Sequence, residues 1–75
     1  MSREASIEKL ERILGQERAS SVVANAMKIA GVSDLDDPTS RLRFGRALCR
    51  NSGVVEAIGR AISIQAILEG ADESD

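Results

Sequence analysis

Three arginines, Arg43, Arg46 and Arg50, are spaced at i, i+3 and i+7 and are the residues of this 75-residue sequence best suited to hold a charged ligand. On a helix, this spacing places three guanidinium groups in one row. Residues 41–60 contain five arginines and one acid, whereas residues 61–75 contain four acids and no base. Because an arginine fork matches phosphate and carboxylate groups, the row predicts contact with nucleic acid or an acidic protein surface, unless it is only a solvated helix face.

This chain has few of the side chains that catalysis and metal binding usually require. It has no histidine and a single cysteine, Cys49, so common zinc ligand sets and Ser/His or Cys/His nucleophile pairs cannot form within it. Glu8, Glu11 and Glu17 are the carboxylates that could act as bases, but they stand among lysine and arginine residues, as on an ordinary charged helix surface. We therefore expect no enzyme activity, no catalytic residue, no metal, no cofactor and no small-molecule substrate.

The composition also predicts where the protein works. One cysteine cannot form an internal disulfide, and nothing in the sequence favours an oxidising compartment. The N-terminal residues lack an apolar stretch of signal-peptide length, and no apolar run approaches the roughly 20 residues of a membrane span. The expectation is a cytoplasmic protein with no membrane partner.

Apolar residues recur at helical spacing in four segments, which predicts helices over residues 2–14, 16–30, 38–51 and 54–69. Ser2 is a candidate N-cap for the first. Gly15 either ends that helix or lies within one continuous helix, at a cost of about 1 kcal/mol. Gly31 and Val32 fit a Schellman motif, and Asp37 followed by Pro38 is a strong start signal for the third helix.

These elements predict an all-α fold, a small four-helix bundle built as two helical hairpins. A single domain would span residues 2–70. Residues 71–75 are polar and acidic and predict a disordered tail. In the third helix, the residues expected to point inward, away from the arginine row, are Leu42, Gly45, Leu48 and Cys49.

The fourth helix has more apolar residues than one buried stripe requires. Part of this surface should therefore face a partner, which would be a second copy or a larger protein, since a chain this short buries little surface alone. The residues expected to bind the partner are those of the arginine row together with four apolar side chains of the fourth helix, Val55, Ile58, Ile62 and Ile64.

An alternative function comes from residues 45–62, in which Leu48 and Cys49 precede a turn glycine, Gly53, and apolar Val54 and Ile62 follow it. This spacing resembles the helix-turn-helix of phage repressors, over about a quarter of the chain. The resemblance implies DNA or RNA binding. Ser52 and Gly59 depart from it, because the motif normally has apolar residues at both places.

The start of the fourth helix also offers no arginine, lysine, asparagine or glutamine to base edges. We therefore favour a small protein–protein interaction module, either homo-oligomerising or an adaptor. In this interpretation the apolar surface provides affinity, and the arginine row provides orientation and choice of partner.

Overall fold

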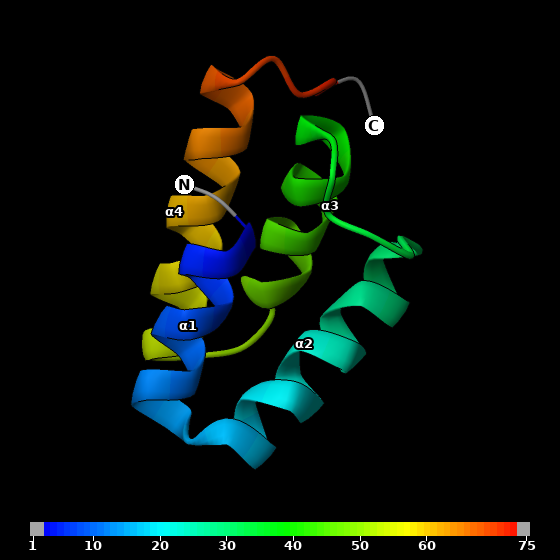
Figure 1. The fold of residues 1–75 in the computed structure, drawn as a ribbon. Coiled ribbons are helices and arrows are strands. Elements are labelled where there is room, and N and C mark those ends of the chain that lie inside the picture. The colour runs from blue at the N-terminus through cyan, green and yellow to red at the C-terminus, as the bar shows by residue number, and fades with distance from the viewer. Residues whose placement is uncertain (1–2, 74–75) are drawn as a thin grey trace.

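The computed structural model of the chain describes residues 3–73, and all regular secondary structure in that range is helical. Its helices are α1 (Arg3–Leu14), α2 (Gln16–Ala30), α3 (Pro38–Leu48) and α4 (Val54–Leu68). They form a small four-helix bundle, as the sequence predicts (Figure 1). The predicted N-cap, Ser2, lies outside the described residues.

Glycines set the ends of these helices where the sequence predicts them. Gly15 has a φ of 84° and separates α1 from α2, so the continuous-helix alternative is wrong. Gly31 has a left-handed conformation, and the N–H groups of Gly31 and Val32 donate to the carbonyls of Lys28 and Met27. This is the predicted Schellman motif, which satisfies two carbonyls at the end of α2.

α3 begins with Asp37 as its N-cap, followed by Pro38. The Asp37 carboxylate accepts hydrogen bonds from the backbone N–H of Ser40 at 2.8 Å and from its hydroxyl at 3.0 Å, while Pro38 occupies the first turn. These bonds hold the pKa of Asp37 below its ordinary value of 3.8. α3 ends three residues earlier than predicted, at Leu48, where the Asn51 side chain donates to the Leu48 carbonyl at 3.2 Å.

The core lies mainly between α3 and α4 and is closed by α1 and α2. Of the four predicted inward residues, Leu42, Gly45 and Leu48 are buried, whereas Cys49 is half-buried. Phe44 is also buried, at 1 % exposure, and it is the only aromatic side chain in the sequence. The remaining core side chains are aliphatic and belong to leucine, isoleucine, valine and alanine.

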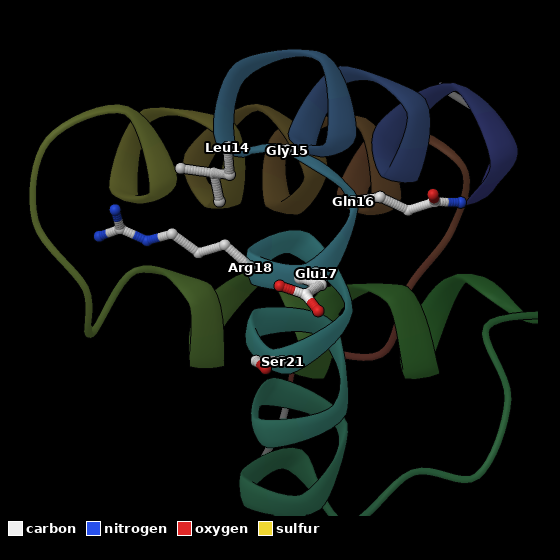
Figure 2. Close-up of a pocket in the computed structure, with 6 residues that line it drawn as sticks. All are labelled: Leu14, Gly15, Gln16, Glu17, Arg18 and Ser21. Carbon is white, nitrogen blue, oxygen red and sulfur yellow. The ribbon is translucent and has the colours of Figure 1, made fainter.

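α3 and α4 form a close antiparallel hairpin (Figures 1 and 2). At one end, the Arg41 guanidinium pairs with the Glu69 carboxylate at 3.1 Å. At the other end, the Cys49 thiol donates to the Glu56 carbonyl, with sulfur and oxygen 3.8 Å apart. By contrast, α2 leaves α1 at a wide angle in both views, so the first pair of helices is an open corner.

The first residues of the predicted disordered tail are attached to the bundle. The N–H of Ala71 donates to the Ala66 carbonyl and completes a second Schellman motif around Gly70, which has a φ of 100°. The N–H of Asp72 donates to the Thr39 hydroxyl at 3.0 Å. These contacts involve residues 71 and 72 only, and the disordered tail remains a prediction, with residues 74 and 75 outside the described range.

Candidate functional site

The arginine row is exposed and gathered on one side of the molecule. Arg43 and Arg46 lie on α3, and Arg50 lies in the turn that follows it. All three line a shallow hollow of about 180 Å³, whose apolar floor includes Ile29 of α2. The structure therefore brings the three predicted residues together, and it places an exposed isoleucine beside them.

The other two arginines of residues 41–60 have structural partners. Arg41 donates to the carbonyls of Leu35 and Asp36, at 2.9 and 3.1 Å, and also pairs with Glu69. It thus joins the α2–α3 loop to the end of α4. Arg60 pairs with Glu56 at 3.5 Å in an i, i+4 arrangement along α4. Neither belongs to the row.

The predicted apolar contact surface of α4 needs correction. Val55, Ile58 and Ile62 are only 8, 4 and 4 % exposed, because they pack in the core of their own chain. In this fold they cannot meet a partner. Ile64, the fourth predicted residue, is 55 % exposed and remains a candidate contact residue.

A second apolar stripe of α4, beside the buried one, faces solvent. Val54 and Leu68 at its two ends are 48 and 75 % exposed. Between them, Ala57 is exposed and Ala61 is half-buried. We call this stripe the α4 seam, and its residues are Val54, Ala57, Ala61, Ile64 and Leu68.

The seam follows the alternating spacing of three and four residues that keeps side chains on one side of a helix facing a partner helix. Sequence reasoning included Ile64 and missed the other four. Their spacing was the available signal, but the neighbouring stripe of Val55, Ile58 and Ile62 is also apolar and helical in period. Periodicity alone does not show which of the two stripes packs in the core.

Two further hollows lie along α1 and α2. The larger, of about 760 Å³, is an open corner around Gly15, shown in Figure 2. The side chains of Gln16 and Arg18 point to opposite sides of it. The smaller, of about 260 Å³, is an apolar groove that includes Ile7, Val23 and Met27. Neither gathers converging polar groups of the kind that orient a small ligand.

Metal and nucleophile chemistry find little support in the described range. Residues 3–73 contain no group of three or more histidine, cysteine, aspartate or glutamate side chains placed to hold a metal ion. Cys49 is half-buried beside the α3–α4 turn, where its thiol donates to a backbone carbonyl. This is the environment of a small packing residue.

The arrangement of α3 and α4 differs from a helix-turn-helix. In that motif, the two helices cross at roughly 90–120°, and the second lies free to enter the major groove. Here α3 and α4 are joined at both ends and lie antiparallel, and one side of α4 is buried along its length.

The helices of residues 3–73 include none with both the length and the apolar composition of a membrane span.

Comparison of the chain with protein-family models, with curated proteins and with solved structures gives no match.

Proposed function

We propose that this chain is a protein–protein interaction module that docks through the α4 seam. The observation that carries the proposal is the exposure of large aliphatic side chains in one continuous stripe. Ile64 and Leu68 are more than half exposed, although the same helix buries a complete second stripe in the core. Exposed apolar side chains are common singly, but a line of them spanning a whole helix is typical of a contact surface.

The expected affinity is modest. Full burial of one aliphatic side chain contributes about 1.5–3 kcal/mol. The seam offers three large side chains that are about half to three-quarters exposed. Association costs about 4–15 kcal/mol in lost freedom. The seam alone therefore supports a weak, reversible complex, and a tighter one requires further contacts.

The arginine row supplies a second, polar contact region in this proposal. The row lies around the hollow that contains Ile29, and its last member, Arg50, lies four residues before Val54, the first residue of the seam. Its charge would favour an acidic partner surface and accelerate encounter, with an effect that salt weakens. It would contribute orientation more than affinity.

Photo-crosslinking tests the proposal. A photo-crosslinking amino acid is introduced in place of Ile64 and, as a control, in place of the exposed α2 residue Asn25. Each variant is irradiated alone and in an extract of the source cell. We expect discrete protein adducts from position 64 that disappear when Leu68→Glu is added to the same chain. The absence of such adducts in both samples, or equal adducts from position 25, would contradict the proposal.

The DNA- or RNA-binding alternative rests on the arginine row alone, because the antiparallel α3–α4 hairpin departs from helix-turn-helix geometry.

A further inference from the structure

We infer that the α4 seam binds the α4 seam of a second copy of this chain, with the two helices antiparallel and a two-fold axis near Ala61. This inference rests on the proposed function and names its partner. Three features of the seam lead to it: the order of its large and small residues, the charges at its two ends, and its length.

The order of side-chain sizes favours an antiparallel pair. The N-terminal and central part of the seam contains the small residues Ala57 and Ala61, and the C-terminal part contains Ile64 and Leu68. In an antiparallel pair, Ile64 of each copy lies over Ala57 of the other, and Leu68 lies over Val54, so large side chains are spread along the whole contact. A parallel pair would place Ile64 and Leu68 over the same residues at one end and Ala57 over Ala57 in the other half, which prevents even packing.

The charges at the ends of α4 favour the same orientation. Arg50 lies just before the start of the helix, while Glu73 and Glu69, the latter paired with Arg41, lie just after its end, and these two acids and Arg50 are exposed. An antiparallel pair brings the acidic end of one copy beside the basic end of the other, and it also opposes the two helix dipoles. A parallel pair would place like charges side by side.

Arg60 is the charge that flanks the seam near the proposed axis, where two copies of it approach each other. Within each copy, Arg60 pairs with Glu56 at 3.5 Å, and this pairing reduces the repulsion between the two copies of Arg60. The flanking positions therefore permit the two-fold arrangement, while the apolar residues of the seam provide its affinity.

The length of the seam sets the expected strength of the dimer. Residues 54–68 span about 21 Å at 1.5 Å per residue. Stable interfaces contain about 20–30 residues from each partner, and the seam with its flanking residues supplies fewer. We therefore expect reversible dimerisation with a dissociation constant above about 1 µM.

Sedimentation equilibrium over a protein concentration range from about 10 µM to 1 mM measures this constant directly. The wild-type protein should shift from monomer to dimer within that range. Leu68→Glu, which places a charge in the seam, should remain a monomer with unchanged helical circular dichroism. Asn25→Glu is the matched control, since Asn25 is exposed on α2, outside both the seam and the arginine row, and it should dimerise like wild type.

Disulfide trapping in a Cys49→Ser background tests the orientation. An equimolar mixture of Val54→Cys and Leu68→Cys chains should form mainly the mixed disulfide, because those ends meet only in the antiparallel pair. Ala61→Cys should crosslink to itself across the axis. Preferred self-crosslinking of Leu68→Cys chains would show a parallel pair and overturn the inference, as would a dimer that survives Leu68→Glu.

A wild-type protein that remains monomeric at 1 mM also overturns the inference, and the photo-crosslinking experiment then separates two cases. Discrete adducts of position 64 with a different protein, lost on Leu68→Glu, would mean that the interaction module stands and only its partner was misassigned. No adduct in either sample would mean that the proposed function fails as well.

Discussion

Gly45 of α3 and Gly59 of α4 face each other at the centre of the antiparallel hairpin, at a distance that leaves no room for a side chain on either. A Cβ on Gly59 would lie 2.7 Å from the Gly45 carbonyl oxygen and 2.7 Å from the Cβ of Leu48. A Cβ on Gly45 would lie 2.9 Å from the Gly59 carbonyl oxygen. These atoms are backbone or backbone-proximal and cannot move aside as a flexible side chain can, so the glycines fix the separation of the two helices.

Gly59→Ala should therefore destabilise the protein, although alanine is the better helix former by about 1 kcal/mol. Overpacking of a core typically costs about 1–3 kcal/mol, and about 1 kcal/mol corresponds to 4–8 °C in a domain of this size. We expect the thermal midpoint to fall by at least about 5 °C. Gly31→Asn is the control, because Gly31 is left-handed and nothing lies near its position for a Cβ. A midpoint that rises in Gly59→Ala would contradict the close approach.

The N-cap of α3 gives a pH-dependent prediction. The pKa of Asp37 is lowered in the folded state, so its stabilising effect is complete above its ordinary value of 3.8 and is lost as pH falls through the lower folded value. Asp37→Ala should lower the thermal midpoint at pH 7, and the difference from wild type should narrow below about pH 4. Asp36→Ala, in the same loop, should have little effect at either pH. A difference for Asp37→Ala that stays constant down to pH 2 would argue against the carboxylate cap.

Arg41 and Arg60 form a matched pair of arginines for a stability comparison. Both have a carboxylate partner, but Arg41 also donates to two loop carbonyls, and its side chain is 18 % exposed against 68 % for Arg60. Arg41→Ala should cost about 1–3 kcal/mol, since it leaves the partly buried Leu35 carbonyl without its donor. Arg60→Ala should cost less than about 1 kcal/mol, as for exposed pairs generally. Urea denaturation of both variants measures the difference, and equal costs would mean that the loop contacts of Arg41 do not stabilise the fold.

The attachment of the tail is tested by two truncations. Deleting residues 71–75 removes the Ala71 bond to the Ala66 carbonyl and the Asp72 bond to Thr39, whereas deleting residues 74–75 keeps both. Because one hydrogen bond contributes about 0.5–1.5 kcal/mol, the longer deletion should lower the thermal midpoint by several degrees. The shorter should leave it nearly unchanged. Identical midpoints in differential scanning calorimetry would indicate that these bonds contribute nothing in solution.

The parts of this fold that follow from the sequence are those set by local backbone chemistry. Gly15, Gly31 and the Asp37-Pro38 pair act within one turn of chain, so their effects can be predicted without the tertiary structure. The arginine row was predictable in part, because helical spacing places Arg43 beside Arg46, while the turn after α3 keeps Arg50 at the same hollow.

The buried side of α4 was not predictable in this way, since both of its stripes are apolar. It depends on where α3 packs, and the strongest signal was Gly59 within the stripe of Val55 and Ile62, matched by Gly45 on the inner side of α3. The tail contacts were equally hidden, because the Thr39 hydroxyl and the Asp72 N–H are 33 residues apart and only the folded hairpin brings them together.

The arginine row separates the favoured function from the nucleic-acid alternative. Replacing Arg43, Arg46 and Arg50 together by glutamine removes three charges from exposed positions while keeping good helix formers with long stems, so the fold should be retained. If nucleic acid were the partner, the triple variant should lose affinity for every sequence tested, and its log–log salt slope should become shallower by about 2–3 units.

Under the protein-partner proposal, the wild-type protein should bind short duplex DNA no more tightly than about 10⁻⁴ M at physiological salt, the weak end of non-specific binding. The net charge of −2 and the acidic residues after α4 oppose tighter binding. Fluorescence anisotropy with labelled duplex and single-stranded oligonucleotides measures this for both proteins. Tight, salt-sensitive binding by the wild type that is lost in the triple variant would contradict the protein-partner proposal. It would show that the arginine row binds a nucleic-acid phosphate backbone.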